Sequence, residues 1–185
     1  MVDTVLLLSG PLAVGKTSLR DLLLADHSFH HIRSSEYLRA LATAQQLSTD
    51  RLGLQEIGDR LDRETDYKWL LTEVAEPLLS AQPDVERWLV DAVRKKRQVE
   101  HFRNRFGASI VHIHLDAAEE VLKQRYEFRA RHLGNYVPGA YELAIAHDNE
   151  QQSRALINVA DIVIRTDISS PSSVVQEALA GIRSR

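Results

Sequence analysis

Lys16 and Thr17 end a segment whose glycine spacing is suited to holding a chain of phosphates. Residues 10–17 read Gly-Pro-Leu-Ala-Val-Gly-Lys-Thr, which fits the pattern G-x-x-x-x-G-K-[ST]. The two glycines let the backbone curl, so that successive N–H groups face a bound anion. The Lys16 ammonium can then reach the β- and γ-phosphates, and the Thr17 hydroxyl can bind Mg²⁺. The motif predicts a site for ATP and Mg²⁺.

The residues around this motif supply the strand and the helix that it requires. Residues 4–9 are a short apolar run of the kind found in buried strands, and residues 17–24 have leucines at helical spacing. The positive end of that helix adds to the field of the loop amides. We therefore expect ATP contacts from the loop and the first helical turn, namely Gly10, Ala13, Val14, Gly15, Lys16, Thr17 and Ser18.

The length of 185 residues, with 44% hydrophobic and 26% charged side chains, is typical of a single globular domain. A net charge of −3 argues against a protein that coats nucleic acid or a membrane surface. The absence of cysteine excludes disulfides and a thiolate zinc site. No apolar stretch reaches the length of a membrane span. We expect a cytoplasmic enzyme whose partners are small molecules, with no nucleic acid and no membrane; the oligomeric state stays open.

Short apolar or β-branched runs alternate with helical segments along the chain. The five candidate strands are residues 4–9, 29–33, 87–91, 110–115 and 161–165. This alternation predicts a three-layer α/β/α fold, in which helices cover both faces of a five-stranded parallel sheet. Right-handed crossovers bring the carboxyl ends of the strands to the edge that carries the phosphate-binding motif. Residues 174–182 predict a final helix.

Two regions are longer than a plain connection between strands. Residues 37–80 have an almost wholly helical pattern, which we expect to break near residues 48–50 and near Pro77. Residues 132–138 contain a Gly-Asn pair and interrupt an arginine-rich helical stretch. The first region predicts a helical subdomain over one side of the site, and the second predicts a mobile flap.

Three segments follow the phosphate-binding motif in a recognisable order. They read Ile-Arg-Ser-Ser-Glu-Tyr-Leu-Arg-Ala at 32–40, Trp-Leu-Val-Asp-Ala-Val-Arg at 88–94, and an arginine-rich helical stretch at 119–131. With them, residues 5–182 resemble the adenylate-kinase-like P-loop kinases, the group that includes nucleoside monophosphate kinases and dephospho-CoA kinase. The resemblance implies a P-loop NTPase core of residues 1–33, 84–125 and 155–185, a helical acceptor-binding insertion of residues 34–83, and a short lid of residues 126–154.

The first two segments supply the predicted acceptor site. By the resemblance, Ser35 and Glu36 open the acceptor-binding helix, and Arg39 faces the phosphate of the acceptor. Ser34 or Ser35 is also a favourable N-cap, and Arg39 follows by about one helical turn. Arg94 is predicted to bind the acceptor phosphate, because a guanidinium matches two phosphate oxygens. A capped helix with a surface arginine remains the alternative for the first segment.

Asp91 and a pair of arginines complete the predicted catalytic set. Asp91 ends the strand beside the phosphate-binding loop, where a carboxylate can orient Mg²⁺-bound water or the attacking oxygen. Arg125 and Arg129 lie four residues apart and therefore share a helix face. The resemblance places both over the transferred phosphoryl group, whose charge they would stabilise together with Lys16. A helix cap remains the alternative for Asp91, and a charge-paired, solvated face remains the alternative for the arginines.

His112 and His114 share one face of the candidate strand at residues 110–115. A two-histidine metal site would need a third ligand at a diagnostic spacing, and the sequence offers none. We therefore expect packed, hydrogen-bonded histidines.

Together these residues predict transfer of the γ-phosphoryl group of Mg·ATP to a small phosphorylated acceptor, with a nucleoside or deoxynucleoside monophosphate as the leading candidate. One alternative is a kinase for another small metabolite, such as dephospho-CoA or an alcohol. An alcohol acceptor needs a general base, for which Glu36 and Asp91 are candidates. The other alternative is a regulatory ATPase that binds nucleotide and transfers nothing. The sequence lacks the Asn-Lys-x-Asp motif expected of a guanine-binding switch.

Overall fold

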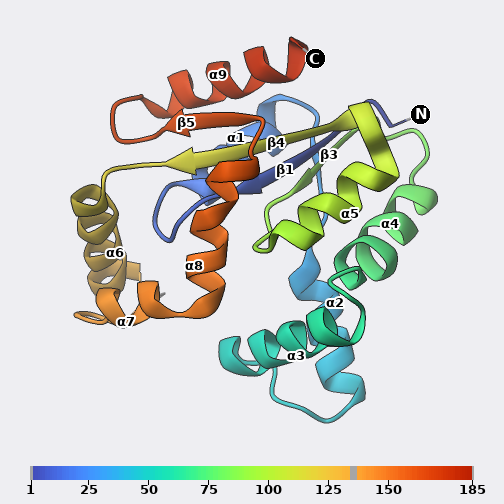
Figure 1. Ribbon diagram of the computed structural model, residues 1–185, viewed down its shortest axis with the longest axis horizontal. Coiled ribbons are helices and arrows are strands. Elements are labelled where there is room, and N and C mark those ends of the chain that lie inside the picture. The colour runs from blue at the N-terminus through green and yellow to red at the C-terminus, as the bar shows by residue number, and fades with distance from the viewer. Residues whose placement is uncertain (1, 134–136, 185) are drawn as a thin grey trace.

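Five parallel strands form the centre of the molecule, in the order β2-β3-β1-β4-β5. The computed structural model describes residues 2–133 and 137–184, and Figure 1 shows how helices surround this sheet. The strands are β1 (Thr4–Ser9), β2 (His30–His31), β3 (Arg87–Val90), β4 (Ile110–Asp116) and β5 (Ile162–Arg165). The predicted three-layer α/β/α fold with a five-stranded parallel sheet is confirmed.

Three strands are shorter than the sequence predicts, namely β2, β3 and β5, the last of which begins at Ile162 and not at residue 161. β2 contains only His30 and His31, because it lies at the edge of the sheet and pairs with β3 over those two positions alone. β3 ends at Val90, which pairs with Leu7 of β1. Asp91 therefore begins the loop after β3, at the edge of the sheet where β1 also ends.

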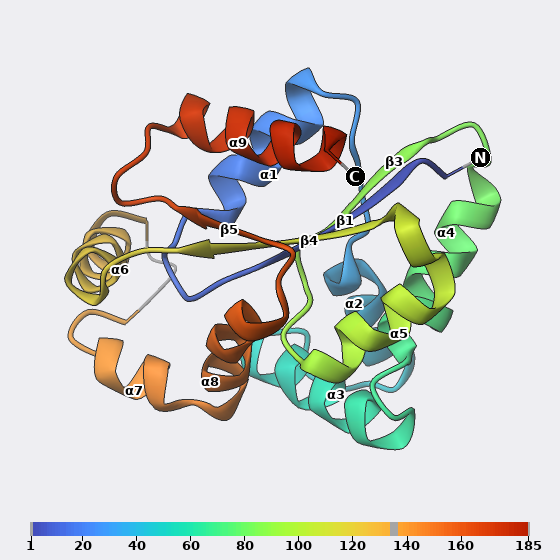
Figure 2. The same cartoon turned by 45° about the horizontal axis from the view of Figure 1, so that its top comes forward.

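Helices connect the strands and cover both faces of the sheet. They are α1 (Lys16–Asp26), α2 (Ser34–Ala44), α3 (Arg51–Glu64), α4 (Glu76–Ala81), α5 (Lys96–Phe106), α6 (Glu119–Leu133), α7 (Tyr141–Ala146), α8 (Asp148–Ala155) and α9 (Pro171–Arg183). α1 and α9 lie together on one face, and α5 covers the other (Figure 2). In the part of the chain that the structure describes, no helix is long and apolar enough to cross a membrane.

The predicted final helix is present but begins earlier than residue 174. It starts at Pro171, whose fixed backbone suits the first helical position. Ser170 caps it by accepting a hydrogen bond from the amide of Ser173 (3.2 Å). This cap satisfies an amide that would otherwise lack a partner.

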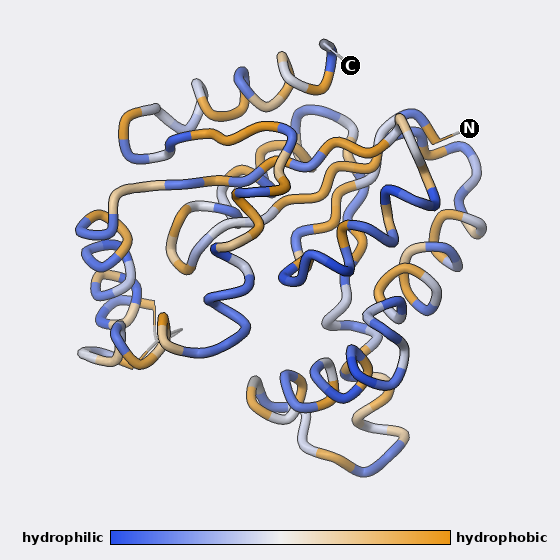
Figure 3. The backbone as a smooth tube through the Cα atoms, viewed as in Figure 1, coloured by the Kyte–Doolittle hydropathy of each residue, from blue (hydrophilic) through white to orange (hydrophobic). Residues whose placement is uncertain are grey.

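The side chains of β1 alternate between two apolar cores. Leu6 and Leu8 pack with α1 and α9, whereas Val5 and Leu7 pack with α5 and the helical region between β2 and β3. All four side chains are fully buried. A strand buried on both faces is uniformly apolar, and the sheet accordingly stands out as hydrophobic in Figure 3, whereas α8 is mainly hydrophilic. Packing on both faces therefore fixes the position of β1 and of the loop that follows it.

The helical region between β2 and β3 divides near residues 48–50, as predicted. α2 ends at Ala44, and α3 begins after Asp50. The Asp50 side chain accepts a hydrogen bond from the amide of Gly53 at 2.8 Å. This N-cap fixes the start of α3.

The predicted break near Pro77 is wrong. A π-helical turn, Leu70–Ala75, runs directly into α4, and Pro77 lies in the first turn of that helix. Proline is tolerated there because its missing N–H removes no hydrogen bond of the α-helix, and the wide turn before it leaves room for the ring. The chain instead breaks at Asp66 and Tyr67, which both have positive φ.

A buried junction joins α3 to α5 and the π-helical turn region. Asp62 of α3 accepts hydrogen bonds from Trp69 Nε1 (2.7 Å) and Gln98 Nε2 (3.1 Å). Burial raises the pKa of Asp62, although both hydrogen bonds act in the opposite direction. The helical region is therefore fixed to the layer that covers the sheet.

The predicted flap at residues 132–138 begins within α6, because His132 and Leu133 are the last two residues of that helix. Residues 134–136, the centre of this segment, lie outside the described residues.

Candidate active site

The phosphate-binding loop connects β1 to α1 and has the curled backbone that its motif predicts. Gly10 has φ 139°, and a Cβ added to it would clash with the carbonyl oxygen of Leu115. Gly15 caps α1 with φ 108°. Ala13 also has a positive φ, of 61°, a conformation that costs an alanine more than a glycine. The loop therefore holds backbone strain at one residue that is not glycine.

Lys16 begins α1 and folds back over the loop. Its Nζ donates hydrogen bonds to the carbonyl oxygens of Gly10 and Pro11, the latter at 2.8 Å. Burial lowers the pKa of Lys16 to about 8; Glu150 acts against this shift, and Arg94 adds to it. The ammonium is thus held by neutral backbone carbonyls, which are weaker partners than charged phosphate oxygens.

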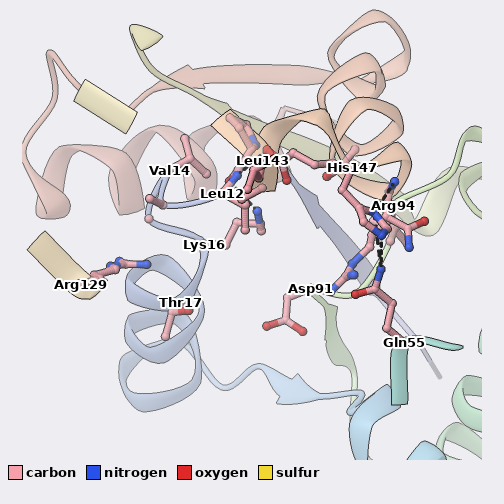
Figure 4. Close-up of a pocket in the computed structure, with 18 residues that line it drawn as sticks. Leu12, Val14, Lys16, Thr17, Gln55, Asp91, Arg94, Arg129, Leu143 and His147 are labelled. Carbon is pink, nitrogen blue, oxygen red and sulfur yellow. Dashed lines mark hydrogen bonds between the residues drawn. The ribbon is translucent and has the colours of Figure 1, made fainter. Parts of the chain in front are cut away.

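A cavity of about 360 Å³, the phosphate cavity, opens in front of the loop (Figure 4). Lys16 and Thr17 line it from α1, Asp91 and Arg94 line it from the loop after β3, and Arg129 lines it from α6. Residues of α7 and α8, together with Gln55 of α3, line the other side of the cavity. Figure 4 shows Asp91 and Arg129 approaching the loop from different sides. The fold therefore brings these five predicted residues to one place.

The other predicted ATP contacts divide between two sides of the loop. Ala13, Val14 and Gly15 line the phosphate cavity, and they also line a further cavity between α1 and the start of α9 that includes Ser18. Gly10 lines neither of these cavities, and its carbonyl oxygen accepts a hydrogen bond from Lys16.

Asp91 is held between two basic side chains. Its Oδ1 lies 2.9 Å from Nε2 of His31, and its Oδ2 accepts a hydrogen bond from Nη1 of Arg20 at 3.0 Å. Burial alone would raise the pKa of Asp91, but His31 and Arg20 outweigh burial and lower it. Asp91 is therefore an ionised carboxylate at neutral pH.

The oxygen atoms of Thr17 and Asp91 fit a magnesium site. Mg²⁺ prefers oxygen ligands and is commonly held by one or two side chains together with substrate phosphates and waters. Thr17 is exposed in the first turn of α1, and the Asp91 carboxylate lines the same cavity. Thr17 would bind the ion directly and Asp91 through water. The ion would neutralise charge on the β- and γ-phosphates.

Three arginines that line the phosphate cavity or the cavity next to it have no anionic partner among the described residues, namely Arg39, Arg94 and Arg129. Arg129 lines the phosphate cavity and the cavity beside α9. Arg94 lines the phosphate cavity and a second one, in which Arg39 also lies. Guanidinium groups bind phosphate and carboxylate strongly, so unpaired arginines in a cavity indicate sites for anions.

Arg125 has a different position from its helical neighbour Arg129. It donates hydrogen bonds to the side-chain and main-chain oxygens of Thr166, at 2.9 and 2.8 Å. Thr166 in turn donates to the carbonyl oxygen of Val14 (2.8 Å). Arg125 lines the cavity of about 280 Å³ beside α9. Its contact with the transferred phosphoryl group stays a prediction.

The second cavity, of about 330 Å³, lies between the loop after β3 and the helices α2 and α3; we call it the acceptor cavity. Ser35 and Arg39 line it from α2. Gln55, Arg94 and Asn149 line both this cavity and the phosphate cavity. A molecule bound in the acceptor cavity would therefore meet the end of a phosphate chain bound along the loop.

The first turn of α8 joins the two cavities. Asn149 Nδ2 donates a hydrogen bond to Asp59 Oδ1 of α3 at 2.9 Å. His147 Nε2 lies 2.8 Å from the side-chain nitrogen of Gln55, also in α3 (Figure 4). α8 therefore connects α3 to the wall of the phosphate cavity.

Glu36, the remaining predicted acceptor residue, lies apart from the acceptor cavity. Its carboxylate accepts a hydrogen bond from Arg33 (2.9 Å), and its side chain is 64% exposed. It lines a separate open groove beside β2. Its contact with an acceptor stays a prediction, and the acceptor cavity as observed includes Ser35, Arg39 and Arg94 from the predicted set.

His112 and His114 are packed and hydrogen-bonded beneath the loop, as expected. His112 Nε2 lies 2.7 Å and His114 Nδ1 lies 2.9 Å from Oγ of Ser9, at the end of β1. Burial lowers the pKa of each histidine to about 4, so both are neutral at pH 7. They support the loop without adding charge to it.

The sequence interpretation missed residues from α1, β2 and α8. Arg20 follows Lys16 by one helical turn, so it lies on the side of α1 that carries Lys16. His31 lies on β2, the strand next to β3. Once Asp91 is placed at the end of β3 in a parallel sheet, both residues are expected near it. Asn149 and Glu150 gave no such signal. They reach the site only because α8 packs against the loop in three dimensions.

The profile of a protein family described as an AAA domain matches residues 5–140, which is most of the chain. The chain belongs to this family. The AAA-domain match contains the loop with Lys16, the Asp91 segment, and both Arg125 and Arg129. No protein of curated function matches the sequence significantly.

Solved kinases share the fold of this AAA domain. A gluconokinase from Sinorhizobium meliloti 1021 matches with a TM-score of 0.51 at 14% identity, covering 98% of this chain and 93% of that one. A sugar kinase from Janibacter sp. HTCC2649 matches with a TM-score of 0.57 at 17% identity, covering 99% and 95%. Shikimate kinase from Aquifex aeolicus vf5 matches with a TM-score of 0.57 at 17% identity, covering 97% and 96%.

These matches show that the AAA domain shares its fold with these kinases. The expected P-loop NTPase fold is therefore confirmed. The narrower resemblance to adenylate-kinase-like enzymes is not shown, because these solved neighbours are named as gluconokinase, sugar kinase and shikimate kinase and are distant in sequence.

Proposed function

We propose that the protein is an ATP-dependent phosphotransferase that moves the γ-phosphoryl group to a small anionic metabolite. The observation that carries the proposal is the junction of two cavities at Arg94, with the phosphate loop in one and Arg39 in the other. Neither arginine has an anionic partner among the residues described. A donor site and an anion-binding site that share a wall would hold two substrates close enough for direct transfer.

On the donor side, ATP is proposed to lie along the loop with its terminal phosphates at Lys16. Phosphoryl transfer needs little covalent chemistry from the protein, so positioning and charge compensation dominate. Arg129 lines the cavities on both sides of the loop, which suits it to stabilise charge that develops on the transferred group. Thr17 and Asp91 would position Mg²⁺ and its water.

On the acceptor side, a nucleoside or deoxynucleoside monophosphate is the first candidate. The guanidinium groups of Arg39 and Arg94 can each bind two oxygens of a phosphate group. A phosphate oxygen is already ionised, so its attack needs no general base. With such an acceptor Asp91 would not have to accept a proton. Its surroundings agree with that role, because each carboxylate oxygen already has a basic partner and the pKa of Asp91 is lowered.

A kinase for a hydroxylated acid is the second candidate. The acceptor cavity also contains oxygen and amide groups of Gln55, Asp59 and Asn149 that can bind hydroxyls. Two of the solved neighbours are named for gluconate and shikimate. In this case Arg39 and Arg94 would hold a carboxylate, and Asp91 would be the candidate base.

Release of ADP, measured across a panel of acceptors, tests both candidates. The panel contains ribo- and deoxyribonucleoside monophosphates, dephospho-CoA, gluconate, shikimate and related sugar acids. We expect one class to raise ADP release well above the rate without acceptor, and Lys16→Met to abolish the increase. Arg97→Ala is the matched control for Arg94→Ala, because Arg97 is exposed, paired with Asp66 and lines neither cavity.

A flat response across the panel, with ATP binding intact, would indicate the regulatory ATPase that transfers nothing. Unchanged saturation by the acceptor in both Arg39→Ala and Arg94→Ala would show that the acceptor binds elsewhere.

A further inference from the structure

Glu150 places a buried carboxylate against the phosphate-binding loop. Its Oε1 accepts a hydrogen bond from the amide of Leu12 at 2.8 Å, and its side chain is only 9% exposed. Ser153, in the next turn of α8, donates to the carbonyl oxygen of Gly10 (3.2 Å). α8 is thereby docked on the first half of the loop, and Glu150 lines the phosphate cavity.

The charge of Glu150 is only partly neutralised within its own cluster. Arg154 donates to Glu150 Oε1 at 3.0 Å, but it also donates to Glu119 Oε2 at 2.7 Å. Tyr141 donates to Glu119 as well and stays neutral, because burial raises its pKa to about 12. Two carboxylates therefore share one guanidinium, which leaves the cluster with a net charge of −1.

Glu150 lies at the end of the loop that takes the terminal phosphates. The Lys16 ammonium contacts the carbonyl oxygens of Gly10 and Pro11, next to the Leu12 amide that Glu150 holds. In this motif the lysine reaches the β- and γ-phosphates. The carboxylate thus faces the terminal part of a bound phosphate chain, whereas the cavity beside α9 lies across the loop.

We infer that Glu150 is a specificity-determining residue that lowers the affinity of the loop for the γ-phosphate and so brings the affinities for ATP and ADP closer together. This inference rests on the proposed function, since it requires the loop to bind nucleotides. A triphosphate brings like charge beside a carboxylate in a cavity where water screens poorly, whereas a diphosphate ends further away. An enzyme that must release ADP and rebind ATP benefits when neither is held too tightly.

The variant Glu150→Gln removes the charge and keeps a carbonyl that can accept from the Leu12 amide. Dissociation constants for Mg·ATP and Mg·ADP are measured by calorimetry for the wild type, Glu150→Gln and Glu119→Gln. Glu119 shares Arg154 but does not line the phosphate cavity, so Glu119→Gln is the matched control. Thermal unfolding without nucleotide reports whether each variant is folded.

We expect Glu150→Gln to bind ATP roughly tenfold more tightly and ADP less than about threefold more tightly, because only ATP places a phosphate beside the lost charge. Glu119→Gln should change both constants by less than about threefold. Weaker or unchanged ATP binding by Glu150→Gln, or an equal gain for both nucleotides, overturns the inference. A wild type that binds neither nucleotide overturns the proposed function as well.

A second variant keeps the test decisive if Glu150→Gln does not fold. Arg154→Gln removes the cation that Glu150 shares and should weaken ATP binding more than ADP binding. No such difference between the two nucleotides would overturn the inference.

Discussion

The phosphate-binding loop and the acceptor cavity share a wall, but they are assembled in different ways. The loop is one continuous segment, and the turn from β1 to α1 places its amides, Lys16 and Thr17. The acceptor cavity draws on α2, α3, the loop after β3 and α8, which are far apart in the chain. The first site depends on local backbone geometry, and the second depends on how four elements pack. In the proposed enzyme, we therefore expect ATP binding to tolerate changes in helix packing and the choice of acceptor to depend on that packing.

The largest expected effect is at the loop itself. Lys16→Met removes the ammonium that the proposed function assigns to the terminal phosphates and should lower phosphoryl transfer by about 10²- to 10³-fold. Circular dichroism and thermal unfolding should show an intact fold, and ADP release measures the loss. A variant that keeps near wild-type turnover would show that the donor does not bind at this loop. The loop could then no longer be compared with the acceptor cavity as the donor site.

The next largest effect separates the two cavities. Arg39 lines the acceptor cavity alone, so Arg39→Ala should raise the KM for the acceptor by roughly ten- to a hundredfold, the range for a lost charge-assisted hydrogen bond. The KM for ATP should change by less than about twofold. Arg94→Ala should raise both constants, because Arg94 lines both cavities. Equal effects of Arg39→Ala on the two substrates would contradict the separation.

The affinity for ATP should depend on pH through Lys16 of the loop, and not through a residue of the acceptor cavity. In the free protein the pKa of Lys16 is about 8, below its usual 10.5, mainly because of burial. Bound phosphates favour the ammonium and raise that pKa. Below pH 8 the free lysine is already protonated, so ATP affinity should be nearly constant. Above pH 8, binding must take up a proton, and affinity should fall by up to about tenfold per pH unit.

Calorimetry at pH 9 in buffers of different ionisation enthalpy measures that proton uptake directly. Lys16→Met is the control, since it has no proton to gain. Identical heats in all buffers for the wild type would show that Lys16 does not change its protonation when ATP binds.

The smallest expected effect concerns strain within the loop. Ala13→Gly removes a Cβ from a residue with φ 61° and should relieve about 1 kcal/mol, which the greater freedom of glycine in the unfolded chain partly offsets. The net gain in the free energy of unfolding should stay below about 1 kcal/mol, with turnover unchanged. Urea denaturation measures it. A clear loss of stability would mean that the buried Ala13 methyl group contributes more by packing than its backbone costs.

The local character of the loop explains why it could be predicted from the sequence. The spacing of Gly10, Gly15 and Lys16 specifies the turn, and apolar runs specify the strands that support it. The errors arose where a non-local effect decides. β2 is short because it is an edge strand that pairs with β3, and Pro77 lies within helical structure because a π-helical turn precedes it.

The acceptor side could be predicted only in part. Arg39 and Arg94 reach the acceptor cavity, but Glu36 pairs with Arg33 outside it, and Arg125 binds Thr166 behind the loop. The spacing of residues along a helix predicts which side chains share a face. It does not predict which neighbouring group a charged side chain will bind. The docking of α8, with Glu150 on the Leu12 amide, has no local pattern at all.

The hydrogen bond from Asn149 to Asp59 has a consequence for engineering this protein. It attaches α8, which touches the phosphate loop, to α3, which shapes the acceptor cavity. We therefore expect substitutions in α3 that break this hydrogen bond to be the exception among changes to the acceptor cavity, because they would also change nucleotide affinity through α8. A directed-evolution campaign would need to select for both properties in the same round, since gains in one can be cancelled by losses in the other.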